Sequence, residues 1–168
     1  MLILETNNII YNIIMLDIEE FEKKIDKKSR LLGIDPGKKR IGVAISDENK
    51  IIATPLTTLI KNKFSDLLNE INKIIEENNI KGIIIGNPIN LDGSSSNSSQ
   101  SAKDLAINLS NNITIPITMW DERLSSRGAF NLSNNIDVNT TKKISKLDEN
   151  SAAFILQGAL DYLKREIT

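Results

Sequence analysis

Three acidic positions in this chain lie at the ends of predicted elements, where their carboxylates could form a catalytic or metal-binding site. Asp35 ends an apolar run and precedes a Pro-Gly turn, and Glu122, with Asp121 before it, follows another apolar run. Asp148 precedes a stretch rich in small residues. A carboxylate at the end of a buried strand is costly to desolvate unless a cation lies beside it. The pattern therefore indicates a site where carboxylates hold a metal ion.

Two residue types are missing, and their absence narrows the chemistry. The 168 residues include no Cys and no His. This excludes thiolate nucleophiles, disulfides, Cys/His zinc sites and a Ser-His-Asp triad. A site built from carboxylates favours hard cations, so Mg²⁺ (or Mn²⁺) is the expected cofactor.

Composition and charge are those of one compact globular domain, with 40% hydrophobic and 26% charged residues. A net charge of −1 counts against a surface that grips nucleic acid everywhere, but it is compatible with a local basic patch. No apolar run approaches the roughly 18 residues that span a bilayer, and the first residues lack the basic start of a signal peptide. We therefore expect a cytoplasmic protein without a membrane partner.

The elements that must position the acids follow from the spacing of apolar residues. Turn residues separate short apolar runs, which predict an antiparallel meander of strands at 31–34, 40–46 and 50–59. Continuous apolar character predicts buried strands at 80–85 and 113–120. Helical spacing predicts helices at 64–75, 102–109 and 148–164, with a further short helix at 125–134 and a mobile segment at 135–146. This order predicts an α/β domain with a five-stranded mixed sheet, three meander strands plus two parallel crossover strands, and helices on both faces.

The first 30 residues are expected to form an N-terminal extension. Ile18, Phe21 and Ile25 have helical spacing, which predicts a short surface helix that caps the domain formed by residues 31–168.

The predicted topology brings the acids toward one end of the sheet. The first strand is central and the 115–120 strand lies on its parallel side, so Asp35 and Glu122 are expected at the carboxyl end, where open α/β sheets bind ligands. Asp148 stands one turn before Ala152 and so continues the buried face of the last helix. Plainer interpretations exist: a turn residue for Asp35, an N-cap for Asp148, and ion pairs with Arg123 for the other two acids. Their joint placement favours the functional interpretation.

Four segments resemble motifs of the YqgF/RuvX-like family, whose members are described as Holliday junction resolvases or pre-16S rRNA nucleases. They are the Asp-containing segment Ile34–Ala44, the Gly-x-Pro loop Ile85–Ser94, the Asp-Glu-Arg-Leu segment Trp120–Ser126 and the Asp and alanine-rich segment Lys146–Ala153. The motifs occur in family order over residues 31–163. The chain departs from the pattern at Asn87, where the family usually has an apolar residue, and in its longer N-terminal extension.

The resemblance implies a ribonuclease H-like fold and a metal-dependent nuclease site. Asp35, Glu122 and Asp148 would be the catalytic carboxylates and metal ligands, with Asp121 and Arg123 supporting them. In such a site one Mg²⁺ activates the attacking water and a second stabilises the leaving oxygen. The implied substrate is structured nucleic acid, either the 5′ end of pre-16S rRNA, branched DNA such as a Holliday junction, or both.

Basic and loop residues near the acids are candidates for contacting that nucleic acid. They are Lys38, Lys39, Arg40, Asn90, Asp92, Gly93, Ser94 and Arg127, with Lys142, Lys143 and Lys146 before the last acid. Arg123 has a donor fork that suits either a phosphate or an ion pair that orients a neighbouring acid. For any single lysine, a solvated surface charge is the better explanation. For the loop residues, a plain turn before a helix explains the sequence as well as a substrate contact does.

Two other functions fit parts of the sequence. Asp35-Pro36-Gly37 also resembles the first phosphate loop of actin-like ATPases and sugar kinases, but those proteins need two such domains. A non-catalytic RNA-binding module that assists ribosome assembly would use the same fold without cutting. The residues leave open whether the substrate is DNA or RNA, and whether the protein is a monomer or a homodimer.

Overall fold

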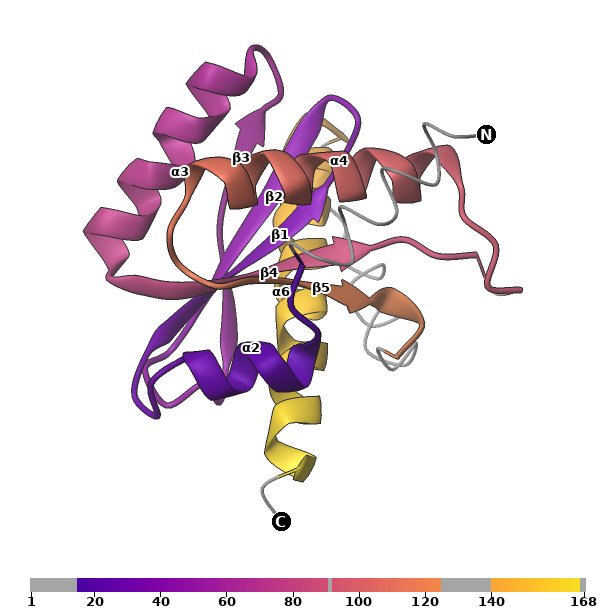
Figure 1. The fold of residues 1–168 in the computed structure, drawn as a ribbon. Coiled ribbons are helices and arrows are strands. Elements are labelled where there is room, and N and C mark those ends of the chain that lie inside the picture. The colour runs from indigo at the N-terminus through magenta and orange to yellow at the C-terminus, as the bar shows by residue number, and fades with distance from the viewer. Residues whose placement is uncertain (1–14, 91, 125–139, 167–168) are drawn as a thin grey trace.

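A computed structural model describes residues 15–90, 92–124 and 140–166, except for the side chains of 140–149 and 165–166 (Figure 1). Five strands form one mixed sheet in the order β3-β2-β1-β4-β5. They are β1 (Arg30–Pro36), β2 (Arg40–Ser46), β3 (Ala53–Ile60), β4 (Ile80–Asn87) and β5 (Ile117–Asp121). The β1–β2 and β2–β3 pairs are antiparallel, and the β1–β4 and β4–β5 pairs are parallel. The predicted mixed sheet with a central first strand is confirmed.

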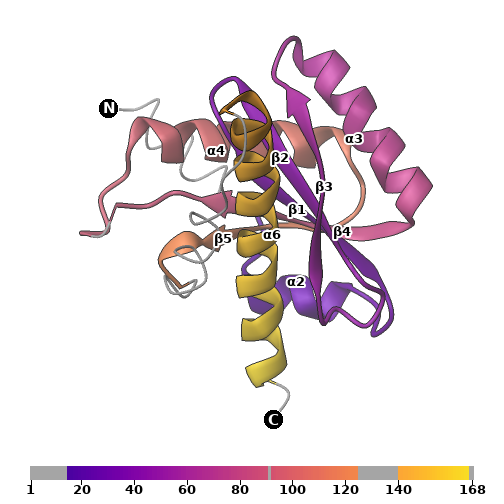
Figure 2. The same cartoon turned by 180° about the vertical axis from the view of Figure 1, so that it is seen from behind.

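Helices cover both faces of the sheet (Figures 1 and 2). The strands alternate their side chains between two cores, so that Leu32 and Ile34 face one and Leu31 faces the other. The first core packs against α3 (Phe64–Asn78) and α4 (Asn97–Asn112), and the second against α2 (Ile18–Lys24) and α6 (Thr140–Glu166). A short 3₁₀ turn, η1 (Glu122–Leu124), follows β5.

The last helix begins earlier than the sequence predicted. Residues 140–146, expected to be mobile, belong to α6, and Asp148 lies more than two turns inside the helix. The N-cap interpretation of Asp148 is therefore wrong. The polar residues from Thr140 onward carry no apolar stripe, so the pattern that marked the buried part of the helix could not show where it starts. The short helix predicted at 125–134 lies outside the described residues.

Three other boundaries differ for local reasons. The strand predicted from Lys50 begins at Ala53, because the Asp47 carboxylate accepts the N–H groups of Ile51 and Ile52 at 2.7 and 2.8 Å and holds them in a turn. Helix α4 begins five residues early, at Asn97, because the Ser96 hydroxyl caps it through the N–H of Ser99. Strand β5 starts at Ile117, just after Pro116, rather than at residue 113.

Residues before β1 pack directly on the sheet. Phe21 in α2 is fully buried, and a Cβ added to Gly82 of β4 would lie 2.7 Å from its ring. Leu16 forms a parallel bridge with Thr118, whose hydroxyl donates to the Leu16 carbonyl at 2.8 Å. Residues 15–25 therefore cover part of the β5 edge. None of the helices in the described ranges is long and apolar enough to cross a membrane.

Candidate active site

Asp35 and Glu122 leave the sheet at the carboxyl ends of its parallel strands. Asp35 is the penultimate residue of β1, and the pairing Ile34↔Ile85 places it level with Gly86 of β4. Gly86 in turn pairs with Trp120 of β5, two residues before Glu122. Strand β4 thus lies between two acids that are far apart in the chain, and it sets their separation.

The Glu122 carboxyl group is partly buried and feels the charge of Asp35. Burial raises its pKa from the ordinary 4.5 to about 7, with the negative charges of Asp35 and then Asp121 adding to the effect. No cationic side chain pairs with Glu122 within the described part of the chain. The structure therefore brings two of the three predicted carboxylates into electrostatic contact.

Gly86 makes room for the Glu122 side chain. A Cβ at this position would lie 2.7 Å from Glu122 Oε1 and 2.6 Å from Ile155 Cδ1 of α6. The carboxylate therefore folds back over β4 in a space that a larger residue would fill. Sequence reasoning did not identify Gly86 as a site residue, although a glycine at the end of a continuous apolar strand can mark a close approach.

Asp148 belongs to the part of α6 that runs past the end of β1. The first turns of this helix lie beside the β1–β2 turn in both views (Figures 1 and 2). The helical period puts position 148 one turn before Ala152, which is fully buried and whose carbonyl oxygen would lie 3.1 Å from a Cβ on Gly33. The Asp148 side chain lies outside the described part, so its role as third ligand stays a prediction.

The carboxyl groups of Asp35 and Glu122 are chemically suited to bind a cation. Two carboxylate groups converge, and a desolvated carboxylate beside another negative charge is stabilised by a nearby positive charge. Among the side chains that the structure describes, no group of three or more acidic residues is arranged to hold a metal. A complete ligand set therefore requires a donor beyond these two, the position predicted for Asp148.

Asp121 and Arg123 form a fork-shaped ion pair beside Glu122. Arg123 Nη2 donates to Asp121 Oδ2 at 2.7 Å, and its Nε and backbone N–H both donate to Oδ1 at 3.0 Å. These hydrogen bonds lower the pKa of Asp121. Of the two interpretations left open for Arg123, the structure shows the ion pair. The contacts also hold η1 in the conformation from which Glu122 turns back toward Gly86.

The four loop residues predicted to contact nucleic acid form a compact exposed turn. The Asp92 carboxylate accepts the backbone N–H and the hydroxyl of Ser94 at 2.8 and 2.6 Å, and Asn90 Nδ2 donates to the same hydroxyl. Gly93 has a φ of 84°, which favours glycine there. Since a Cβ on Gly93 would lie 3.6 Å from Arg123 Nη1, the turn sits next to the Asp121–Arg123 pair.

The unusual Asn87 at the end of β4 is buried and has a partner. The hydroxyl of Ser99, itself fully buried, donates to Asn87 Oδ1 at 2.9 Å. This bond ties the last residue of β4 to the first turn of α4 and so fixes both ends of the 88–96 loop. Nothing in the spacing of the sequence pointed to Ser99, because its partner is reached only through the packing of α4 on the sheet.

The predicted basic residues fall into two groups. Lys38, Lys39 and Arg40 are exposed in the turn that follows Asp35, where a Cβ on Gly37 would overlap the carbonyl oxygen of Arg40. Arg127 lies outside the described residues, as do the side chains of Lys142, Lys143 and Lys146.

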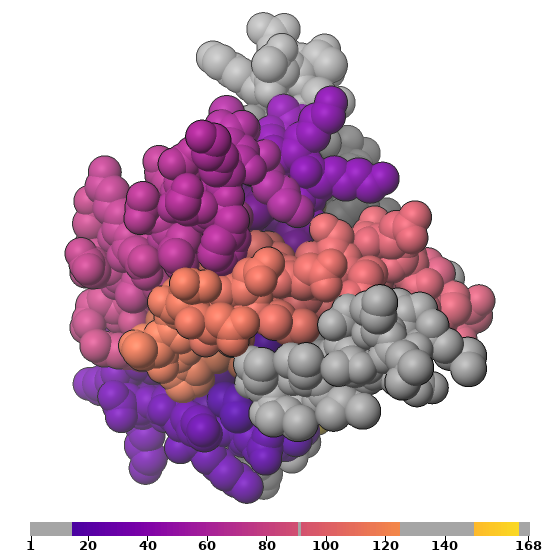
Figure 3. Space-filling view, turned by 45° about the horizontal axis from the view of Figure 1, so that its top comes forward, coloured from indigo at the N-terminus to yellow at the C-terminus, as the bar shows by residue number. Residues whose placement is uncertain are grey.

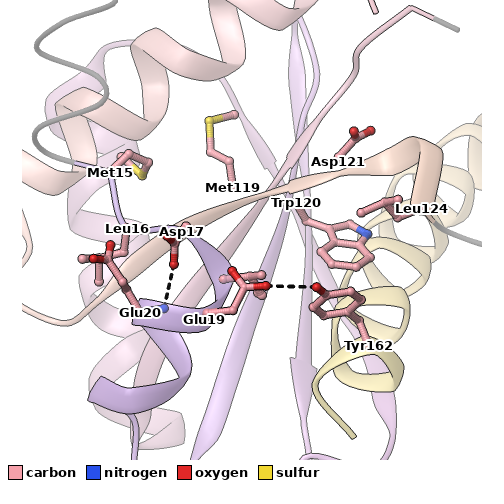
Figure 4. Close-up of a pocket in the computed structure, with 11 residues that line it drawn as sticks. Met15, Leu16, Asp17, Glu19, Glu20, Met119, Trp120, Asp121, Leu124 and Tyr162 are labelled. Atoms are coloured by element: carbon pink, nitrogen blue, oxygen red, sulfur yellow. Dashed lines mark hydrogen bonds between the residues drawn. The ribbon is translucent and has the colours of Figure 1, made fainter. Parts of the chain in front are cut away.

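A separate hollow of about 420 Å³ lies between α2 and β5 (Figure 4). Trp120 and Tyr162 line it with their rings edge to face, 5.4 Å apart, and the Tyr162 hydroxyl donates to Glu19 Oε1 at 3.0 Å. Asp121 is the one predicted site residue in its lining, and Asp35 and Glu122 do not reach it. The hollow and the carboxylate pair are therefore different places.

The sheet order and the two covered faces define a ribonuclease H-like protein, and similarity to solved structures agrees. The complex of T. thermophilus RuvC with a Holliday junction substrate superposes with a TM-score of 0.53 at 10% identity, covering 82% of this chain and 96% of that one. The yeast mitochondrial Holliday junction resolvase Ydc2 gives a TM-score of 0.50 at 15% identity, covering 86% and 83%. The predicted fold is confirmed.

Residues 29–162 match the family described as "RuvX: Holliday junction resolvase", and the chain belongs to this family. A protein of Pelagibacter ubique named "Putative pre-16S rRNA nuclease" is 52% identical, over 89% of this chain and 99% of its own. A Rhodobacter capsulatus protein of the same name is 40% identical, over 87% and 92%. The resemblance seen in the four motifs is therefore confirmed.

Proposed function

We propose that this protein is a nuclease that hydrolyses phosphodiester bonds in structured nucleic acid with the help of Mg²⁺ or Mn²⁺. The observation that carries the proposal is the convergence of Asp35 and Glu122 at the carboxyl end of the sheet, with the pKa of Glu122 raised to about 7. Membership of the RuvX family supports the same conclusion.

Asp35, Glu122 and Asp148 would hold the cation, and the residues around them would keep the acids in place. Bound Mg²⁺ lowers the pKa of the attacking water and stabilises negative charge on the leaving oxygen. In the net reaction, the water oxygen bonds to phosphorus, the bond from phosphorus to the leaving oxygen breaks, and that oxygen takes a proton. Asp121 and Arg123 orient η1, and Gly86 gives the Glu122 carboxylate its space.

The substrates that we propose are suggested by the names of the relatives and by the description of the family. The names of the curated relatives point to pre-16S rRNA, for which we propose the 5′ end, and the family description points to Holliday junctions. Lys38, Lys39 and Arg40 lie beside Asp35 and would contact phosphates next to the bond that is cut. We expect the protein to meet such substrates in the cytoplasm.

The test compares cleavage of labelled pre-16S rRNA and a four-way DNA junction in Mg²⁺ and in EDTA. Asp35→Asn, Glu122→Gln and Asp148→Asn should each lower the cleavage rate by at least about 100-fold, because each removes charge that would hold the cation. Asp104→Asn, an exposed acid on α4, is the matched control and should cleave like wild type. Tight binding by wild type without cleavage of either substrate would contradict the nuclease and favour a ribosome-assembly module.

A further inference from the structure

We propose that the basic ridge formed by Lys38, Lys39, Lys61 and Lys63 binds phosphates of the nucleic-acid backbone from the site of cleavage outward, with Lys61 and Lys63 contacting those farther from the bond that is cut. This inference rests on the proposed nuclease function and deepens it, because it says where the substrate runs. Two of these lysines, Lys61 and Lys63, come from the connection between β3 and α3, which the sequence motifs do not include.

The two halves of the ridge are joined by the backbone. The N–H of Lys61 donates to the carbonyl oxygen of Lys39 at 2.9 Å, and Arg40 and Ile60 are the paired residues at the adjoining ends of β2 and β3. In Figure 3 the purple atoms of the β1–β2 turn lie against the magenta atoms that follow β3. Two lysine-bearing segments more than 20 residues apart in sequence thus lie side by side.

The charge of the ridge is not neutralised by carboxylates. Lys38, Lys39 and Lys63 are exposed, and Lys61 Nζ contacts the neutral hydroxyl of Ser101 at 3.4 Å. Throughout the described ranges, none of the four ammonium groups has a carboxylate within ion-pair distance, not even Asp66, the acid nearest to Lys63 in sequence. In a chain with a net charge of −1, four such lysines at one end of the sheet make a local site for a polyanion.

The position of the ridge relative to Asp35 indicates the direction in which a bound nucleic-acid strand would run. The ridge begins three residues after Asp35, and the contact between Lys61 and Ser101 extends it toward α4. Helix α4 covers the face of the sheet opposite α6, near whose Ile155 the Glu122 carboxylate lies. A strand cut at Asp35 would lay its following phosphates along this ridge. Contacts of this kind fix the register of a nucleic acid but do not read its sequence.

The experiment measures binding of a fluorescent four-way DNA junction in EDTA, across a series of KCl concentrations. The double variant Lys61→Gln/Lys63→Gln should bind at least several-fold more weakly than wild type. Its plot of log K against log salt should be less steep, by about 0.9 for each phosphate that the variant no longer neutralises. Lys81→Gln is the control, since this exposed lysine is the second residue of β4, at the opposite end of the sheet, and should change neither quantity.

Each result decides between distinct conclusions. If wild type binds and cleaves the junction but the double variant keeps the same affinity and salt slope, the ridge is wrong and the nuclease stands. If wild type neither binds nor cleaves the junction or labelled pre-16S rRNA, both proposals fail. The double variant removes the contact between Lys61 and Ser101. If it does not fold for that reason, the single variant Lys63→Gln gives the same test, since it disturbs no described side-chain contact.

Discussion

At the scale of single residues, Glu122 makes the stability of the protein depend on pH. Its pKa of about 7 in the folded state exceeds the ordinary 4.5, so the folded protein holds this proton more tightly than the unfolded chain does. The stability that this provides is complete below about pH 4.5 and is lost as the pH rises through 7. In EDTA, we expect the melting temperature to fall between pH 5 and pH 8, and Glu122→Gln to remove part of that fall.

Thermal unfolding followed by circular dichroism at four pH values measures the effect. The pKa values of the Asp47, Asp92 and Asp121 carboxyl groups are lowered, so these three groups titrate below this window. Glu70→Gln, an exposed acid on α3, serves as the control. If the melting temperature depends on pH identically in wild type and Glu122→Gln, the pKa of the partly buried Glu122 carboxyl group is not raised.

Gly86 gives a prediction about space at the acid pair. In Gly86→Ala the new methyl group would meet Glu122 Oε1 at 2.7 Å and Ile155 Cδ1 at 2.6 Å, so the carboxylate must move. We expect a cost of about 1–3 kcal/mol in the free energy of unfolding. We also expect loss of most cleavage activity, as a small displacement of a catalytic group slows a reaction by about 100-fold.

The control for this variant is Gly82→Ala at the other end of β4. There the methyl group would crowd the Phe21 ring at an equal 2.7 Å but would touch neither acid. Urea unfolding should show similar destabilisation of the two variants, while cleavage assays at a temperature where both are folded should separate them. Equal activity of the two would mean that the room left by Gly86 has no functional role.

Some residues of the candidate site could be predicted from the sequence and others could not, because some are marked by local sequence patterns and others only by contacts between elements. Asp35 and Glu122 could be found because each sits at the end of an apolar strand, and strand ends are visible in the sequence. Gly86 and Ser99 could not, because their roles depend on contacts across elements, with Glu122 and Asn87 respectively. The Arg123 side chain was noticed, but spacing cannot tell an ion pair from a phosphate contact.

At the scale of elements, the Asn87–Ser99 hydrogen bond joins β4 to α4. Ser99→Ala would leave Asn87 Oδ1 buried without this donor, which should cost about 1–3 kcal/mol of unfolding free energy. Urea titration of Ser99→Ala, Asn87→Leu and the double variant measures the coupling. The double variant should be more stable than the sum of the two single losses predicts, because both polar partners are then gone.

The matched control is Ser98→Ala, in the same helical turn but without a described side-chain hydrogen bond. It should unfold within about 0.5 kcal/mol of wild type. A loss at Ser98 as large as at Ser99 would mean that the effect belongs to the helix terminus rather than to the link with β4.

Element types were predictable, and their ends were less so. The apolar runs of the sheet and the stripes of α3, α4 and α6 are long enough to define strand and helix directly. Ends depend on caps and turns, such as the Asp47 carboxylate that delays β3 and the Ser96 hydroxyl that starts α4. The start of α6 at Thr140 lies in a mostly polar segment whose sequence has no continuous apolar stripe, so periodicity carries little signal there.

At the scale of the whole molecule, charge is distributed unevenly although it nearly cancels. The basic ridge lies at the end of the sheet where β1 leaves Asp35, whereas the hollow beside α2 is lined by Asp17, Glu19 and Glu20. A polyanion would therefore be attracted to the ridge more strongly than to the acidic residues that line the hollow. This asymmetry could not be predicted from net charge, since it arises only when β3 brings Lys61 next to Lys39.

The position of α6 after all five strands in the chain has a consequence for a protein that is still being made. Until this helix leaves the ribosome, the sheet face formed by Leu31, Ala44, Ile84 and Trp120 is open to water, and position 148 is missing. The proposed nuclease would thus lack one of its three carboxylates, and be inactive, until α6 has been made and has packed on the sheet.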